Sequence, residues 1–147
     1  KHYEINSFHS GLLDEVDINK LGATDYTILY AEPGSATVNQ GVMTYSFTLY
    51  VMDMINDEVG DAPNKERLGR LDTYSETLQI LNDVIAEFKQ SLSTQSWVDD
   101  QVVLQLPITC EPFTARFNNL LTGWSATINV DVNNKNNLCI APIEANT

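Results

Sequence analysis

Basic residues are scarce in this sequence. Its 147 residues include eight Lys and Arg against twenty Asp and Glu, which gives a formal net charge of −12. Proteins that grip nucleic acid need clustered cations to displace counterions from the phosphates, and only Lys65, Arg67 and Arg70 lie close together here. Specific DNA binding is therefore not expected. The acidic balance suits either simple solubility or a surface that repels DNA sliding past it.

Cysteine and histidine are also rare. Cys110 and Cys139 are far apart and fit no C-x-x-C spacing, so we expect two small buried thiols in a reducing compartment, with no disulfide required. Whether the two cysteines lie near each other stays open. His2 and His9 are the only histidines, and a zinc site or a catalytic triad would need partners from distant parts of the chain.

Motifs of the common catalytic and cofactor-binding folds are absent. The sequence contains no G-x-S-x-G, no phosphate-binding glycine loop and no G-x-G-x-x-G. The acids Asp53, Asp57, Glu58 and Asp61 are the best candidate for a calcium site, but Gly60 is not where an EF-hand requires it, and a solvated loop before an acid-rich helix start is favoured. We predict no enzyme, no catalytic residue, no metal and no cofactor.

Long apolar runs and linkers are missing too. No run approaches the roughly 20 residues that a membrane-spanning helix needs, and the polar start shows no signal peptide, so no membrane association is expected. Because the chain begins with Lys1 instead of Met, whether an N-terminal segment is missing stays open. Hydrophobic residues make up 43% of the chain, an ordinary globular share, and we expect a single domain over residues 1–147.

Alternating apolar and polar residues predict the strands. The longest alternation runs from Val42 to Met54, and its polar face turns apolar at Tyr50, Met52 and Met54, which predicts cover on both sides at that end. The cleanest alternation starts at Trp124, so its indole is expected in the core. Tyr45, Phe47 and Tyr50 are likewise expected to pack in the core and not to form a ligand cage. Further strands are predicted at 5–8, 26–31, 102–106 and 108–113, with a loop or hairpin tip at 34–41.

One long amphipathic helix is predicted between these strands. Asp61 is a good N-cap, Pro63 fits the first turn, and the helix is expected to run to about Ser91. Its apolar stripe comprises Leu68, Leu71, Tyr74, Leu78, Leu81, Ile85, Phe88 and Leu92. Strands on either side of one helix predict an α+β fold, in which the helix packs across one face of a mostly antiparallel sheet.

Several segments, in this order, resemble small proteins from the head–tail joining region of tailed bacteriophages. The resemblance rests on four segments: Ile5-Asn6-Ser7-Phe8, Tyr45-x-Phe47-x-Leu49-x-Val51-x-Asp53, the long helix with Asp83 near its middle, and Gly123-Trp124-x-Ala126-x-Ile128-x-Val130 followed by Cys139. Together they cover most of the chain. This sequence lacks the helix that precedes the first strand in such proteins.

The resemblance implies a tail terminator or neck protein. Such a protein forms a homo-oligomeric ring of the virion, at the head–tail junction or at the end of the tail tube, and assembles in the bacterial host cytoplasm. Its partners would be copies of itself and neighbouring tail-tube or connector proteins, while DNA passes through without specific binding. The number of subunits and the position of the ring stay open.

A loop after the helix is the candidate subunit contact. Trp97 lies there in a polar stretch, and aromatic side chains are enriched at protein interfaces, so we expect Trp97, Asp99 and Asp100 to lie at an interface. The alternative function is a small, acidic, non-enzymatic α+β binding or adaptor domain. A ring in solution would favour the first reading, and a stable monomer with a well-formed pocket the second.

Overall fold

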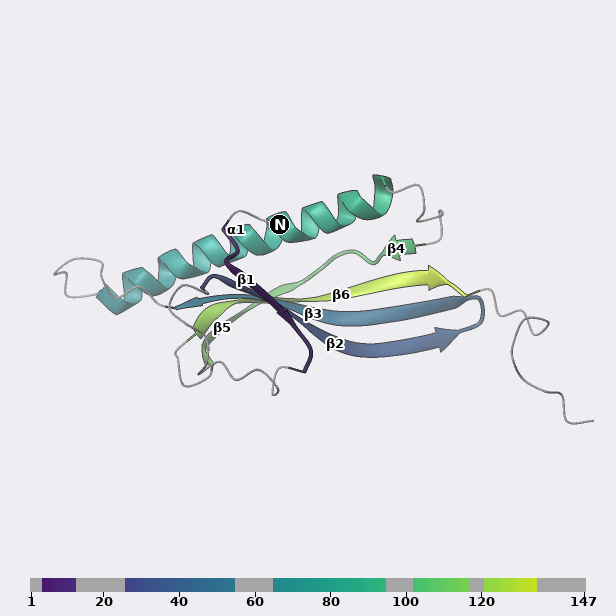
Figure 1. Cartoon of the computed structure of the whole chain (residues 1–147), viewed down its shortest axis with the longest axis horizontal. Coiled ribbons are helices and arrows are strands. Elements are labelled where there is room, and N and C mark those ends of the chain that lie inside the picture. Colours follow the sequence, from purple (N-terminus) through teal and green to yellow (C-terminus); the bar gives the residue numbers. More distant parts are fainter. Residues whose placement is uncertain (1–3, 13–25, 55–64, 95–101, 117–120, 135–147) are drawn as a thin grey trace, which may run out of the picture.

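A mostly antiparallel sheet carries one long helix on a single face (Figure 1). The computed structural model describes residues 4–12, 26–54, 65–94, 102–116 and 121–134. Along the chain, the elements are β1 (Ser7–Ser10), β2 (Ile28–Asn39), β3 (Val42–Met54), α1 (Lys65–Thr94), β4 (Val102–Leu104), β5 (Cys110–Arg116) and β6 (Leu121–Asn133). The predicted α+β class is confirmed.

The long strands β3 and β6 form the centre of the sheet. The order is β1-β2-β3-β6-β4, and β5 also pairs with β6. Only β1 and β2 run parallel; every other pairing in the described residues is antiparallel. β4 and β5 follow one another along the same edge of β6, with Val102 opposite Val132 and Cys110 opposite Ala126. Pro112 therefore lies in a strand at the sheet edge, where its missing N–H is tolerated.

The predicted loop or hairpin tip at residues 34–41 is wrong for residues 34–39, because β2 continues to Asn39, and right for the hairpin turn at residues 40–41. The pairing with β3 shifts register between Pro33 and Ala36, and this irregularity lets the strand pass through Pro33-Gly34-Ser35. Gly34 also needs its small size, since a Cβ there would lie 2.8 Å from the carbonyl oxygen of Ser46. The turn itself is short: Gln40 and Gly41 link the strands, and Gly41 has a φ of 81°.

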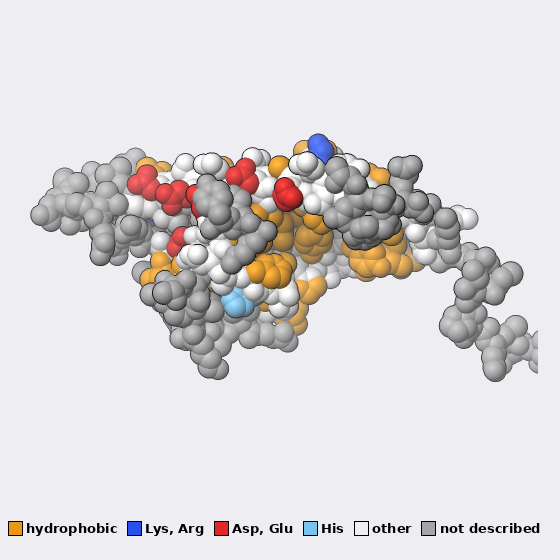
Figure 2. Space-filling view, turned by 45° about the horizontal axis from the view of Figure 1, so that its top comes forward, with side chains coloured by type: hydrophobic (Ala, Val, Ile, Leu, Met, Phe, Trp, Pro, Cys, Tyr) orange, Lys and Arg blue, Asp and Glu red, His pale blue; other side chains and the backbone are white. Residues whose placement is uncertain are grey.

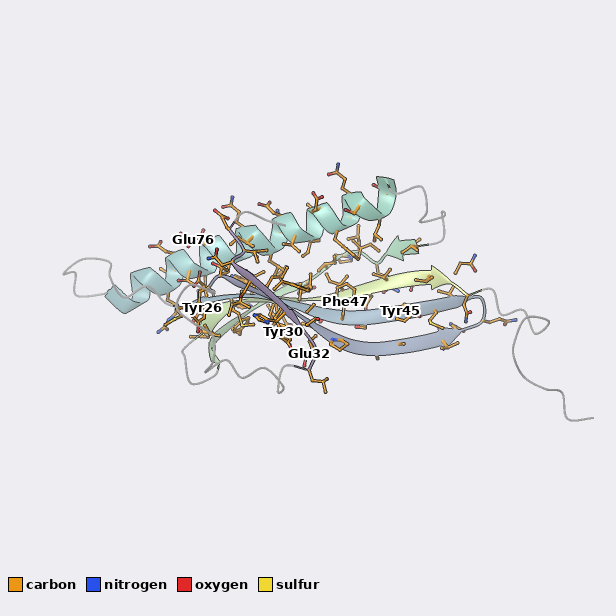
Figure 3. All side chains as sticks on the ribbon, in the orientation of Figure 1. Tyr26, Tyr30, Glu32, Tyr45, Phe47 and Glu76 are labelled. Atoms are coloured by element: carbon orange, nitrogen blue, oxygen red, sulfur yellow. The ribbon has the colours of Figure 1, made fainter. Side chains whose placement is uncertain are left out.

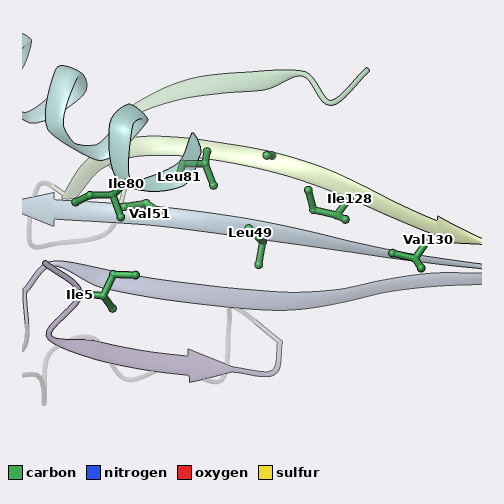
Figure 4. Packing of buried hydrophobic residues seen from close by; sticks show 8 residues of the cluster. Ile5, Leu49, Val51, Ile80, Leu81, Ile128 and Val130 are labelled. Carbon is green, nitrogen blue, oxygen red and sulfur yellow. The ribbon is translucent and has the colours of Figure 1, made fainter. Parts of the chain in front are cut away.

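The main core lies between α1 and the sheet (Figure 4). Val51 of β3 and Leu81 of α1 have no exposed surface, and Ile128 of β6 is 1% exposed. Ile80 and Leu49 complete the centre of this cluster. The odd residues of β3 and the even residues of β6 form its floor, as the alternation predicts, because successive strand side chains point to opposite faces.

The predicted helix stripe is right towards the end of α1 and wrong near its start. Leu71 is 54% exposed, whereas Thr73 and Thr77 are buried. Both hydroxyls are satisfied inside the helix: Thr73 Oγ1 donates to the Gly69 carbonyl at 2.8 Å, and Thr77 Oγ1 to the Thr73 carbonyl at 2.5 Å. Threonines that bond back to the preceding turn can face the sheet without leaving a polar group unpaired.

Trp124 fills the space beneath this part of α1. Its ring packs edge-on against Tyr74 at a centroid distance of 6.0 Å, and its Nε1 donates to the Tyr74 carbonyl at 2.9 Å. The side chain is half-buried and packs against the main core, as expected.

A second, smaller cluster lies on the opposite face of the sheet. Ile28, Tyr30, Met52 and Leu121 are each at most 2% exposed. The Tyr30 hydroxyl donates to the Leu12 carbonyl at 2.9 Å. The prediction of cover on both sides at the far end of β3 is therefore confirmed for Tyr50 and Met52 and wrong for Met54, which is 44% exposed at the last position of the strand.

Candidate interaction surface

The sheet continues past the end of α1 as a tongue built from β2, β3 and β6 (Figure 1). The ring of Phe47 packs edge-on against Phe88 of α1 at 5.9 Å. Closer to the β2–β3 turn on the same face, Tyr45 and Val38 are exposed in the described part of the chain, whereas Val130 of β6 is still buried in the main core. The candidate interaction surface lies in this part of the sheet.

Four apolar side chains at this end of the face form what we call the distal strip: Val38, Met43, Tyr45 and Val132, the last of which also packs against the main core. Val38 is paired with Met43 and Met43 with Val132, so these three lie side by side across the sheet. Val38 is 64% exposed and Tyr45 is 46% exposed, while Met43 and Val132 are half-buried. Large exposed apolar side chains grouped on one surface commonly mark a contact with another molecule.

The expectation that Tyr45 packs in the core is wrong. Tyr45 lies closer to the β2–β3 turn than Phe47 does (Figure 3), and its side chain is exposed there. Phe47 and Tyr50 do pack, on opposite faces: Phe47 against the main core and Tyr50 against the second cluster. The alternation reports correctly which face Tyr45 occupies, but it carries no information on what lies above that face.

The outer edge of β2 is open along most of its length. β1 pairs only with Ile28–Ala31, and in the described part of the chain no strand pairs with this edge over residues 32–39. An open edge offers unpaired N–H and C=O groups to another strand. Pro33 supplies no N–H, so the usable part of the edge is its last stretch, Ala36–Asn39, beside the distal strip.

An apolar hollow lies where β1 ends and the open edge begins. It has a volume of about 410 Å³ and is lined by Ser10, Gly11, Ala31, Glu32, Pro33 and Phe47. Its position connects the end of β1 to the start of the open edge.

The opposite face of the tongue is polar and internally bonded. Thr44 Oγ1 donates to Asp131 Oδ1 at 2.5 Å, and Gln105 Nε2 donates to both carboxylate oxygens of Asp131 at 2.9 and 3.0 Å. These bonds, the one from Thr44 first, lower the pKa of Asp131, because they favour its charged form. The network links β3, β6 and the residue after β4, and so fixes the tongue on its polar side.

Replacement of Thr44 by valine is expected to raise the pKa of Asp131 towards the ordinary value, because the largest stabilising bond to the carboxylate is lost. The pKa is lowered in the fold, so its contribution to stability is present above the ordinary pKa of Asp and is lost as the pH falls through the folded value. Titration of the side-chain carboxyl by NMR measures the shift. Thr48→Val, on the same face of β3, is the control. An equal pKa of Asp131 in the unmodified protein and in both variants would contradict the role of the Thr44 hydrogen bond.

Acidic side chains gather on the outer surface of α1. Asp72, Glu76, Asp83 and Glu87 are exposed there, and Figure 2 shows red side chains along this side of the molecule. The distal strip, in contrast, contains no charged residue. Two copies with a net charge of −12 each would repel through their helices, so the uncharged strip is the better place for contact.

Several residues singled out in the sequence fall outside the described residues. These are Trp97, Asp99 and Asp100 of the expected interface, together with Asp57, Glu58, Asp61, His2 and Cys139. Asp53 is described, and its Oδ2 accepts a hydrogen bond from Thr27 Oγ1 at 2.5 Å. Cys110 is half-buried, and burial raises the pKa of its thiol, so the thiol stays protonated at neutral pH.

Within the described ranges, no three His, Cys, Asp or Glu side chains come together in a group able to hold a metal ion. Those same ranges contain no helix that is both long and apolar enough to cross a bilayer. The organised features that remain are the distal strip, the open β2 edge and the hollow between β1 and that edge.

Comparisons with known proteins add no relative. No protein-family model matches this sequence, and no curated protein sequence is significantly similar to it.

Proposed function

We propose that this chain is a structural protein of a tailed bacteriophage, one that assembles with copies of itself into a ring at the head–tail junction or at the end of the tail tube. The distal strip carries the proposal from the structural side. It leaves apolar side chains exposed on a tongue that extends beyond the helix, next to an open strand edge. The segments that resemble head–tail joining proteins support the phage context.

Ring formation requires one surface of each copy to meet a different surface of the next, so that the contact repeats and closes. The distal strip and the open edge of β2 lie at one end of the sheet, whereas the acidic helix surface lies along one side (Figure 2). A contact at the tongue therefore leaves the acidic surface free. Acids that face a central channel would keep DNA from adhering to it.

The first test is the mass of the assembled particle. Light scattering after gel filtration, together with negative-stain electron microscopy, is expected to show a closed ring at high protein concentration or after addition of tail-tube or connector proteins. A protein that remains monomeric in every one of these conditions would contradict the proposal.

Tyr45→Lys is expected to raise the protein concentration needed for assembly at least roughly fivefold, because a charge replaces an aromatic contact in the strip and central aromatic contacts are the ones that contribute about 1 kcal/mol or more. Leu71→Lys is the matched control, since Leu71 is similarly exposed but lies on α1. Both variants should keep the melting temperature of the unmodified protein. Equal weakening by both would show that the strip has no special role.

The second candidate is a small, non-enzymatic binding or adaptor domain. The apolar hollow beside Pro33 and Phe47 favours it, because small ligands and peptide side chains bind in concave, mostly apolar sites. A monomer that binds a peptide or an apolar ligand in this hollow, with unchanged affinity in Tyr45→Lys, would support this candidate over the ring.

The expected interface at Trp97, Asp99 and Asp100 stays a prediction. Combined Asp99→Lys and Asp100→Lys substitutions are expected to disturb assembly more than folding. The same light-scattering measurement, paired with thermal unfolding, separates the two effects, and equal losses of both would count against an interface at that loop.

A further inference from the structure

The chain leaves the sheet beside the tongue, close to the distal strip. β6 ends at Asn133, and the next residue, Asn134, donates its N–H to the Gly41 carbonyl at 2.9 Å, at the β2–β3 turn. Thirteen residues follow Asn134 in the sequence. Six of them, Leu138-Cys139-Ile140-Ala141-Pro142-Ile143, form an uncharged apolar segment.

We propose that residues 138–143 of one copy add as a strand to the open β2 edge of a second copy, where Leu138 and Ile140 cover the distal strip. This inference rests on the proposed self-assembly and names the contact that would produce it. The binding partner is thus a second copy of this chain. The binding site is the β2 stretch from Ala36 to Asn39, which includes Val38, together with Tyr45 of β3.

The two partners match in chemistry. The open edge supplies backbone N–H and C=O groups, which an extended peptide satisfies by joining the sheet. Alternate residues of an added strand point to one face, so Leu138 and Ile140 would lie together over Val38 and Tyr45. Pro142 has no N–H and would end the pairing, which leaves an added strand about as long as the free stretch of β2.

The length of the connecting chain favours a second copy over the same copy. β6 is separated from a strand outside β2 by three strand spacings, roughly 14 Å. Asn134 and Leu138 are four residues apart and span at most roughly 13–14 Å when fully extended. The two lengths are about equal and the connection must also pass around Gln40 and Gly41, so a strand that begins at Leu138 fits the edge of a second copy better than that of its own chain.

Contact through this segment also avoids the acidic surfaces. Residues 138–143 carry no charge, and neither does the distal strip. Two copies can therefore approach at the tongue without burying an unpaired carboxylate, which would be costly. The acids of α1 stay on the solvent side of such a contact (Figure 2).

Disulfide trapping between two distinguishable copies tests the inference. The first copy carries Thr37→Cys and Cys139→Ser; the second, enlarged by a tag, keeps its native Cys139. Thr37 is paired with Thr44 and so lies on the face opposite the distal strip, where Cys139 also points when Leu138 and Ile140 cover the strip. Both carry Cys110→Ala, so that no other thiol reacts. Thr37 is exposed and similar in size to cysteine, so the fold should tolerate the change. The mixture is oxidised with oxidised glutathione and separated on a non-reducing gel.

The control places the first thiol elsewhere. Ser75→Cys replaces Thr37→Cys, since Ser75 is exposed on α1 and is also close to cysteine in size. The Thr37→Cys copy is expected to form the mixed dimer at least roughly tenfold faster than the Ser75→Cys copy, because docking raises the effective concentration of the two thiols into the millimolar range. Equal rates overturn the inference.

A single chain with both Thr37→Cys and Cys139 tests whether the segment binds its own sheet instead. If it closes a disulfide within one chain while the mixed copies form none, the segment lies on its own sheet and the inference fails. Light scattering on the same mixtures separates this failure from that of the proposed function: assembly without the mixed dimer removes only the inference, whereas mixtures that stay monomeric remove the self-assembly as well.

Discussion

Gly123→Ala is expected to lower the free energy of unfolding by about 3 kcal/mol and the melting temperature by roughly 10 °C. Gly123 lies in β6 opposite Met52 of β3, at the centre of the sheet. A Cβ at this position would lie 1.9 Å from the carbonyl oxygen of Val51 and 3.0 Å from the Cα of Met52. Because these neighbours are backbone atoms, the two central strands would have to separate.

Denaturant unfolding followed by circular dichroism measures the loss, and Gly41→Asn is the control. Gly41 has a positive φ of 81° but nothing within 4 Å of its Cβ position, so the added side chain meets open space. Asparagine tolerates such a φ, and the effect should stay within about 0.5 kcal/mol. If Gly123→Ala proves as mild as the control, the close approach of β3 and β6 is misplaced.

Leu81→Ala is the second substitution with a large expected effect. Leu81 has no exposed surface and lies in the main core between α1 and the sheet (Figure 4). Its truncation removes apolar contacts and leaves a cavity, which costs about 2–5 kcal/mol and lowers the melting temperature by roughly 6–20 °C. Thermal unfolding is the direct measurement.

Leu71→Ala provides the matched control on the same helix. Leu71 is 54% exposed, so the change should cost no more than about 0.5 kcal/mol. The pair therefore tests which face of α1 meets the sheet. Similar losses for both leucines would mean that the helix is rotated relative to its described position.

The helix shows clearly where a sequence pattern is insufficient. Leu71 and Leu81 follow the same apolar stripe in the sequence, and yet only Leu81 is buried. At the start of α1, Thr73 and Thr77 take the buried side and their hydroxyls bond within the helix, while the ring of Trp124 packs against the neighbouring Tyr74. The apolar stripe cannot predict which side of the helix is buried here, because the Trp124 ring that packs against this part of α1 belongs to a strand fifty residues away in the chain.

Only part of the candidate surface could be predicted from the sequence. The alternation in β3 assigns Tyr45 to the same face as Val51, and the structure agrees. Its exposure could not be predicted, because it depends on where α1 ends above the sheet. The open edge of β2 was missed for a related reason: the Pro33-Gly34 pair looks like a turn, while the register shift that lets the strand continue depends on pairing with β3.

The sequence by itself determined the class of the fold, the two central strands and the existence of one long helix. These features follow from local periodicity, which each segment carries within its own residues. Tertiary structure alone decided which helix face is buried, where the cover of the sheet stops and which strand edge stays open. Those outcomes depend on how distant segments compete for the same space, and no local pattern records that competition.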